Sequence, residues 1–481
     1  MPRMTRPSAR WALASLSLSM LMPSLDTSIA NAGLPTLAQA FAASFQAVQW
    51  IVLAYLLAIT TLIVSVGRLG DMIGRRRLLL FGISLFTAAS LLCGLAPTLG
   101  WLIAARTAQG LGAAMMMALT IAFVGETVPK ERTGSAMGLL GTMSAIGTTL
   151  GPSLGGVLIA GFGWRAIFLV NVPLGLVNLL LAQRYLPVDR RELTPARVGF
   201  DLVGTVLLAL TLAAYALAMT IGRGRFGPLN AAVLSAAACG ASVFVRVEAK
   251  ASSPLIRLAM FRDWDLSASL VTSSLVSTVM MATLVVGPFY LSRTLGLDTA
   301  LVGLALSLGP LVAALTGLPA GRLVDRLGPR RMTVAGLSGI AGGALALSMM
   351  PSRFGLAGYL APIPIVTAGY ALFQTANNTA IMTNVRKDQR GVVSGMLSLS
   401  RNLGLITGAS LMGAVFARAS ATIDITTAPP EAVARGMRVT FAVAVSLILS
   451  ALAVVASSRR GCGIRVRGRA GVGPAEALRA A

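Results

Sequence analysis

The sequence is poor in the residues from which catalytic and metal sites are usually built. It has no histidine, and its three cysteines are Cys93 and Cys239, inside apolar stretches, and Cys462 near the C-terminus. These positions support neither a disulfide framework nor a Cys/His metal site. The sequence also has no nucleophile–base arrangement and no GxxxxGK[ST] phosphate-binding motif. We therefore predict that the protein is not an enzyme, uses no cofactor and is not driven by ATP.

Charged residues are scarce as well, whereas apolar residues are abundant. Of the 481 residues, 12% are charged and 56% are hydrophobic, while soluble domains are about a quarter charged. The apolar residues form runs of about 20, the length that crosses a bilayer as a helix. There are fourteen runs, at residues 11–32, 47–69, 78–96, 99–123, 135–161, 165–186, 200–221, 229–247, 266–292, 300–321, 332–350, 356–383, 393–417 and 437–457. The pattern predicts an all-α polytopic membrane protein with fourteen transmembrane helices.

The net charge of +24 would suggest a nucleic-acid partner in a soluble protein. Here the basic residues stand between the apolar runs, and no basic stripe is interleaved with aromatic residues. With the N-terminus inside, thirty of the 40 basic residues fall in inward loops and tails and eight in outward loops. Cytoplasmic loops are enriched in Lys and Arg. We therefore predict that both termini are cytoplasmic and that the partner is a lipid bilayer, not nucleic acid.

Two charged phrases occur twice. GRLGDMIGRRR at 67–77 returns as GRLVDRLGPRR 254 residues later, and KERTGSAMG at 130–138 returns as KDQRGVVSG 257 residues later. A repeat that joins membrane-length segments is typical of a duplicated transporter. Two related halves account for twelve runs, and the pair between them has no counterpart. We predict an N-terminal six-helix bundle (1–187), two inserted transmembrane helices with linkers (188–265), a C-terminal six-helix bundle (266–458) and a basic cytoplasmic tail (459–481).

Six phrases, in order along the chain, resemble one family. They are LDTSIANAGLP (25–35), QWIVLAYLL (49–57), the loop phrase at 67–77, LIAARTAQGLGAA (102–114), GTTLGPSLGG (147–156) and WRAIFLVNVPLG (164–175). The chain resembles the major facilitator superfamily, in particular its fourteen-helix drug:proton antiporter branch. The resemblance covers nearly the whole chain. It implies two six-helix bundles that rock around a central site.

Asp26 and Arg106 lie well inside apolar runs, where an ionised side chain costs about 2.5–3.5 kcal/mol. Such residues usually face a cavity and carry function, so we predict that Asp26 takes up and releases a proton. Arg106 would steer Asp26 or a substrate, or else hold the fold through backbone carbonyls. The alternative for Asp26 is a solvated, purely structural place near the outer helix end.

The fifth run carries Gly147, Gly151, Pro152, Gly155 and Gly156. Glycines four residues apart share one helix face and permit close helix contact, and proline withdraws a backbone hydrogen bond. Ordinary small-residue packing would give the same pattern. The second half has alanine at position 409, where the proline would be. The resemblance implies an antiporter motif, in which the bent helix blocks leak.

The repeated loop phrase predicts a conformational latch. In the family this loop holds the halves in one conformation: an aspartate faces a neighbouring helix N-terminus, and an arginine pairs with an acid at the end of the fourth helix. The resemblance gives these roles to Gly67, Asp71, Gly74, Arg75 with Glu126, and Asp325 in the second copy. Pro329 replaces the first arginine there, so we expect a weaker latch. The alternative is that these charges only set topology.

A substrate cavity is the least determined feature. Amides are expensive in lipid unless they are turned inward, which makes Gln374, Asn377 and Asn378 candidate substrate contacts, or else helix–helix hydrogen-bonding groups. Trp50, Tyr55 and Gln109 are further candidates for the cavity wall. Arg401 is equally compatible with a side chain that extends to the membrane interface.

These observations predict proton-coupled export, by antiport, of amphipathic small molecules, drugs or antibiotics, across the plasma membrane by alternating access. The partners would be the small-molecule substrate, protons and the bilayer, and the protein would function as a monomer. One alternative is a transporter of a specific endogenous metabolite. The other is a membrane receptor that does not transport.

Overall fold

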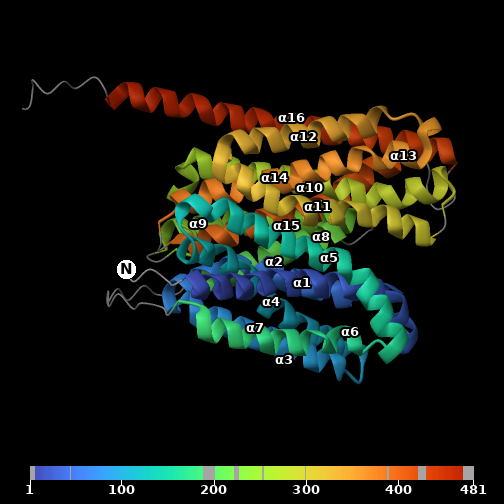
Figure 1. The fold of residues 1–481 in the computed structure, drawn as a ribbon, viewed down its shortest axis with the longest axis horizontal. Coiled ribbons are helices and arrows are strands. Elements are labelled where there is room, and N and C mark those ends of the chain that lie inside the picture. The colour runs from blue at the N-terminus through green and yellow to red at the C-terminus, as the bar shows by residue number, and fades with distance from the viewer. Residues whose placement is uncertain are drawn as a thin grey trace, which may run out of the picture.

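The computed structural model describes residues 6–43, 45–187, 201–220, 227–251, 254–297, 299–386, 389–420 and 429–469, with the side chains of a few helical residues also left undescribed. Within these ranges the chain is almost entirely helical. Its helices run side by side in two bundles (Figure 1). The N-terminal bundle is drawn from blue to green and lies below the C-terminal bundle, drawn from yellow-green to red.

The described helices follow the predicted runs closely. The N-terminal bundle contains α1 (Arg6–Ala40), α2 (Phe45–Ile73), α3 (Arg75–Gly94), α4 (Leu99–Thr127), the 3₁₀ turn η1 (Lys130–Arg132), α5 (Thr133–Phe162), α6 (Ala166–Leu169) and α7 (Asn171–Tyr185). Next come α8 (Leu202–Thr220), α9 (Pro228–Lys250) and η2 (Leu258–Arg262). The C-terminal bundle contains α10 (Trp264–Phe289), the π-helical turn η3 (Tyr290–Thr294), α11 (Thr299–Leu327), α12 (Pro329–Met349), η4 (Ser352–Phe354), α13 (Gly355–Leu360), α14 (Pro362–Asn384), α15 (Arg390–Ala419) and α16 (Pro430–Arg469).

Twelve helical segments within the described ranges are long and apolar enough to cross a membrane. The two predicted runs outside that set, 11–32 and 393–417, are also helical, as parts of α1 and α15. Both are rich in serine, and each carries an internal ionisable residue, Asp26 or Arg401. The protein is therefore an all-helical, multi-pass membrane protein. Fourteen as the number of membrane crossings stays a prediction, as does the division of the chain into domains.

The two bundles repeat one packing plan. Gly112 of α4 lies so close to α3 that an added Cβ would be 2.8 Å from the Gly82 carbonyl oxygen. Gly369 of α14 lies equally close to α12, with an added Cβ at 2.8 Å from the Gly336 carbonyl oxygen. The sequence offsets of 257 and 254 residues therefore relate positions that make the same contacts. Close packing through glycine is how helices associate in lipid.

The repeated phrase turns the chain at a glycine in each half. Gly74 connects α2 to α3 with φ of 107°, and Gly328 connects α11 to α12 with φ of 85°. Only glycine adopts such values without strain. This explains why the phrase keeps a glycine at this position in both copies.

Helix α8 packs beside the junction of the two bundles, against α2 and α15. The Tyr215 hydroxyl of α8 is hydrogen-bonded to the Thr407 hydroxyl of α15, and the Ser410 hydroxyl donates to the Met219 carbonyl oxygen. Asn230 of α9 donates to the Ala218 carbonyl oxygen of α8 at 2.8 Å, which joins α8 and α9. Helices α8 and α9 therefore belong to the same assembly as the bundles.

Candidate functional site

Asp26 lies at the centre of a buried polar network in the N-terminal bundle. Only 1% of its surface is exposed, and it forms an ion pair with Arg106 of α4. Two amides complete its surroundings: Gln109 donates to Asp26 Oδ1 at 3.0 Å and Asn171 donates to the same oxygen at 2.8 Å. Ser90 of α3 accepts a hydrogen bond from Gln109 at 2.8 Å. The carboxylate is thus held by charge-assisted hydrogen bonds and not by solvent.

Arg106 is fully buried and is held on three sides. Its Nε donates to the Ile51 carbonyl oxygen at 3.1 Å, and its Nη1 donates to Gln109 Oε1 at 2.6 Å. The guanidinium carbon lies 4.2 Å from the centre of the Tyr55 ring and 5.7 Å from that of Phe168. Cation–π contacts of this kind strengthen when water is excluded. Arg106 thus contacts both Asp26 and the backbone.

The glycine face of α5 packs against α1, the helix that carries Asp26. An added Cβ would lie 2.7 Å from the Leu21 carbonyl oxygen at Gly147 and 2.3 Å from Ser28 Cβ at Gly151. At Gly155 the nearest α1 atom would be 3.4 Å away, in ordinary contact, and at Gly156 nothing lies within 4 Å. Three of the four glycines therefore face α1, with the tightest approach at Gly147 and Gly151.

Pro152 lies inside α5 and cannot donate to the carbonyl group four residues earlier, that of Thr148. The Ser28 hydroxyl of α1 donates to this carbonyl oxygen at 2.8 Å. The hydrogen bond that proline withdraws from α5 is replaced by one from α1. The Gly-Pro motif is therefore coupled to the helix of Asp26, two residues before Ser28 in the sequence.

The second copy of the loop phrase joins the two halves. Asp325 near the end of α11 accepts hydrogen bonds from the backbone N–H groups of Gly134 at 2.8 Å and Ser135 at 2.9 Å, and from the Ser135 hydroxyl. These groups form the first turn of α5, where a helix leaves N–H groups without internal partners and favours negative charge. Pro329 takes no part in these contacts and begins α12. The relative strength of the two copies stays a prediction.

Glycines bring the same helices together beside Asp325. An added Cβ at Gly138 of α5 would lie 2.4 Å from the Gly317 carbonyl oxygen of α11. In the first copy, an added Cβ at Gly67 of α2 would lie 2.1 Å from the Gly391 carbonyl oxygen of α15. The two halves therefore meet backbone to backbone at the end of the molecule that carries the repeated phrases.

The rest of the predicted latch is only partly visible. The side chains of Asp71 and Glu126 lie outside what the structure describes. The predicted Arg75–Glu126 ion pair therefore lies outside the described residues, although the Arg75 side chain is described and is buried. The latch roles of these residues stay predictions.

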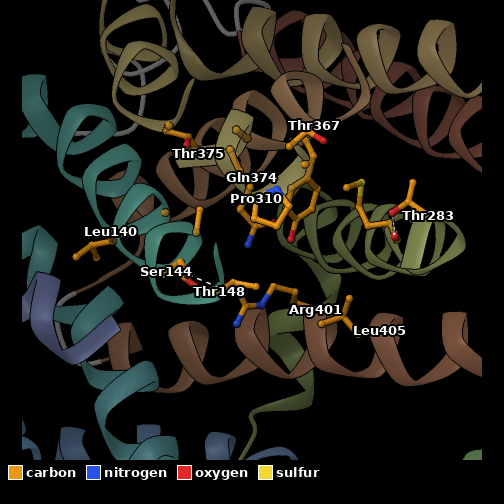
Figure 2. Close-up of a pocket in the computed structure, with 18 of the residues that line it drawn as sticks. Leu140, Ser144, Thr148, Thr283, Pro310, Thr367, Gln374, Thr375, Arg401 and Leu405 are labelled. Carbon is orange, nitrogen blue, oxygen red and sulfur yellow. Dashed lines mark hydrogen bonds between the residues drawn. The ribbon is translucent and has the colours of Figure 1, made fainter. Parts of the chain in front are cut away.

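A cavity of about 350 Å³ lies between the two halves, a size typical of small-molecule sites. The N-terminal half contributes residues from α1, α4 and α5, and the C-terminal half contributes residues from α10, α11, α13, α14 and α15. Figure 2 shows Ser144 and Thr148 of α5, Arg401 of α15 and Gln374 of α14 around this space. The lining extends along α11 to Gly317, where this helix meets α5.

The residues predicted to line the cavity lie in different parts of the structure. Gln374 and Asn378 line the cavity between the halves. Asn377 instead accepts a hydrogen bond from Ser269 of α10 at 2.6 Å. Tyr55 and Gln109 belong to the surroundings of Asp26 and Arg106, and Trp50 is 40% exposed near the start of α2. Neither Asp26 nor Arg106 is among the described residues that line this cavity.

Several residues at these sites escaped the sequence analysis. Asn171 and Ser90 complete the Asp26 network, but an isolated amide or hydroxyl in an apolar run carries no distinctive pattern. Gly134 and Gly138 do carry one, because both belong to the second repeated phrase and have counterparts at Gly391 and Gly395. The repeat alone would have located this contact between the halves. Arg401 was assigned no cavity role by the sequence analysis.

A buried ion pair in one bundle, glycine contacts between two repeated halves and a cavity at their junction define a membrane transporter. The family model described as Major Facilitator Superfamily matches residues 16–409, and the chain belongs to this superfamily. Transporters of this superfamily carry small-molecule substrates and are not enzymes.

Similar proteins fit this assignment. The chain is 34% identical over 416 residues to Multidrug resistance protein Stp of Mycobacterium tuberculosis, covering 86% of this chain and 77% of that protein. It is 28% identical over 413 residues to Riboflavin transporter RibZ of Clostridioides difficile, covering 85% and 89%. The solved structure of the human organic anion transporter MFSD10 superposes with a TM-score of 0.67 at 15% identity, covering 93% of this chain and 99% of that one. That low identity shows a shared fold and nothing more.

Proposed function

We propose that the protein exports amphipathic small molecules across the cell membrane in exchange for protons. The observation that carries this proposal is the buried Asp26–Arg106 ion pair with its two amides. Its relatives include a protein named as a multidrug resistance protein at 34% identity and one named as a drug efflux pump at 32% identity, which supports drugs or antibiotics as substrates. The protein would act as a monomer that crosses the membrane fourteen times, with both termini in the cytoplasm.

Proton uptake by Asp26 would remove the counter-ion of Arg106. A buried charge that loses its partner destabilises its surroundings by about 3–5 kcal/mol, which favours movement of α1 relative to α4. Since α1 packs against the glycine face of α5, that movement is transmitted to α5. The first turn of α5 binds Asp325, so a proton on Asp26 acts on the contact between the halves.

The orientation of the protein in the membrane determines which conformational state this structure represents. If the repeated phrases face the cytoplasm, the backbone contacts at Gly138 and Gly67 close the cavity on that side. The structure then corresponds to an outward-facing transporter. The membrane potential would contribute about 2.3 kcal/mol per proton charge at 100 mV.

Everted membrane vesicles provide the test. Respiration acidifies their lumen, and an antiporter dissipates the pH gradient when a substrate is added, which a pH-sensitive dye reports. We expect a response to some members of a panel of amphipathic antibiotics with the wild-type protein, and none with Asp26→Asn. Asp265→Asn serves as the matched control, because this carboxylate is 62% exposed. A response of Asp26→Asn equal to that of the wild type would refute proton coupling through Asp26.

The runner-up is export of a specific endogenous metabolite. It is favoured by the similarity to a protein named as a riboflavin transporter. The same vesicles would then respond to riboflavin or another single metabolite and to no antibiotic on the panel.

A further inference from the structure

Arg401 of α15 stands in the cavity between the two halves. Its side chain is half-buried and lines the cavity together with Gln374 and Ser144. Figure 2 shows it extending from α15 beside Thr148 of α5, with Gln374 across the space on α14. The side chain therefore does not extend to the membrane interface, which the sequence allowed.

Within the part of the cavity wall that the structure describes, no acidic side chain balances this charge. Among the described lining residues there is one arginine and no aspartate or glutamate. Arg106–Asp26 and Arg330–Asp265 are ion pairs of described residues, and neither involves Arg401. An ionised group inside a membrane protein usually pairs with another group or marks a substrate path. The cavity thus carries a net positive charge.

The fold does not require arginine at this position. The residue 257 positions earlier is Ser144, which lines the same cavity from α5. One half therefore satisfies the repeated helix geometry with a small hydroxyl side chain. The guanidinium group of Arg401 is therefore particular to the C-terminal half, and it lies where a ligand would bind.

The other lining groups suit the two ends of an amphipathic anion. Gln374, Asn378 and Tyr370 offer N–H and O–H donors. Met20, Met137 and Met280 offer flexible apolar surface that adapts to ring systems. A planar carboxylate pairs with guanidinium through two parallel hydrogen bonds, whereas a cationic ligand would be repelled.

We propose that the cavity selects organic anions, with Arg401 as the residue that pairs with the ligand's carboxylate. This proposal rests on the proposed export function for its biological meaning, since it names the substrate class of that function. Zwitterions that present a free carboxylate belong to the same class, and purely cationic amphiphiles do not.

Three fluorescent probes test the charge preference: pyrenecarboxylate, pyrenecarboxamide and pyrenemethylammonium, which share a ring system and differ in charge. Binding is measured by fluorescence anisotropy with the full chain in lipid nanodiscs, after subtraction of empty nanodiscs of the same lipid. We expect the carboxylate to bind at least about tenfold more tightly than the ammonium compound, a difference of about 1.4 kcal/mol. Equal or tighter binding of the ammonium compound, or no binding of the carboxylate, overturns the proposal.

Substitutions assign the preference to one residue. Arg401→Gln should weaken carboxylate binding about tenfold or more and leave carboxamide binding nearly unchanged. Arg401→Lys should retain most of the preference because it keeps the charge. Arg418→Gln is the matched control, since Arg418 lies on the same helix and is exposed. Undiminished carboxylate binding by a folded Arg401→Gln variant, shown by its size-exclusion profile, overturns the assignment.

The binding assay needs no proton gradient and no transport. A charge preference without substrate-dependent proton movement in vesicles would refute the export function and leave the site intact. Proton-coupled export of cations without this preference would do the reverse. The two failures are therefore distinguishable.

Discussion

The two bundles pack their backbones in the same way, but their buried side chains differ. In the N-terminal bundle, Arg106 and Gln109 of α4 bind the carboxylate of Asp26 on α1. The residues 257 positions later on α14 are Ile363 and Val366, which are 5% and 2% exposed and belong to an apolar core. Glycine contacts between neighbouring helices are kept in both bundles. The duplicated scaffold is therefore maintained by small residues, while the ion pair of Asp26 and Arg106 in the N-terminal bundle has apolar side chains at the corresponding α14 positions.

The cavity shows the opposite asymmetry. Its charged residue, Arg401, comes from the C-terminal half, and the N-terminal counterpart is Ser144. We therefore expect substitutions in the N-terminal bundle to affect proton coupling and those in the C-terminal half to affect ligand choice.

The largest effect should follow from removing the guanidinium of the ion pair. Arg106→Gln leaves the Asp26 carboxylate buried without a positive partner, so the free energy of unfolding should fall by about 3–5 kcal/mol. The apolar counterpart variant, Ile363→Val, should lower it by about 0.5–1.5 kcal/mol. Unfolding of the purified proteins in one detergent measures both.

The double variant Asp26→Asn/Arg106→Gln separates stability from coupling. Because both charges are gone, most of the lost stability should return, while proton-coupled export stays absent. Equal losses in Arg106→Gln and Ile363→Val would contradict the assumed difference between the bundles.

Removing the charge of Asp325 should loosen the contact between the halves. Hydrogen bonds to a charged group contribute about 1.5–3 kcal/mol, so Asp325→Asn should shift the population of open and closed states about 10- to 100-fold. Spin labels at Glu131→Cys and Leu327→Cys in a cysteine-free background report the distance across this contact. We expect a new, longer component in Asp325→Asn and none in Asp265→Asn. An unchanged distance distribution would show that Asp325 does not hold the halves together.

A pair of glycine variants tests the contact between α1 and α5. In Gly151→Ala the new methyl group would overlap Ser28, and we expect a loss of about 1–3 kcal/mol in unfolding free energy. In Gly156→Ala it would meet nothing within 4 Å, and stability should be unchanged or higher by about 0.4–1 kcal/mol. Thermal unfolding of the two variants side by side decides this. Similar melting temperatures would show that the contact between α1 and α5 does not require glycine at position 151.

The smallest effect concerns helix α8. Tyr215→Phe removes the hydrogen bond between α8 and α15, which should cost about 0.5–1.5 kcal/mol. Tyr185→Phe is a suitable control, because the described contact of this ring is its stacking on Trp11, which phenylalanine keeps. Equal melting temperatures of the two variants would indicate that α8 contributes little through this bond.

Much of the fold was predictable because membrane helices are recognised from length and apolarity alone. The repeat located the loops, and its 254- and 257-residue offsets contain the information that pairs the glycines, although the sequence analysis did not use it for Gly134 and Gly138. The residues Asp26 and Arg106 were identifiable because charge is rare in lipid. The sequence did not show in which direction side chains point: Tyr55 faces Arg106 and Gln109 faces Asp26, whereas Arg401 faces the cavity. Side-chain direction depends on how helices are rotated against one another, and a nearly uniform apolar pattern does not encode that rotation.

Helix α5 takes part in three of the features described above. Its first turn binds Asp325, its middle lines the cavity through Ser144 and Thr148, and its glycine face rests on α1. Because one helix makes all three contacts, a tilt of α5 at one of them would also displace the other two. A compound that binds between α1 and α5 would therefore inhibit the transport cycle without competing with the ligand for the cavity.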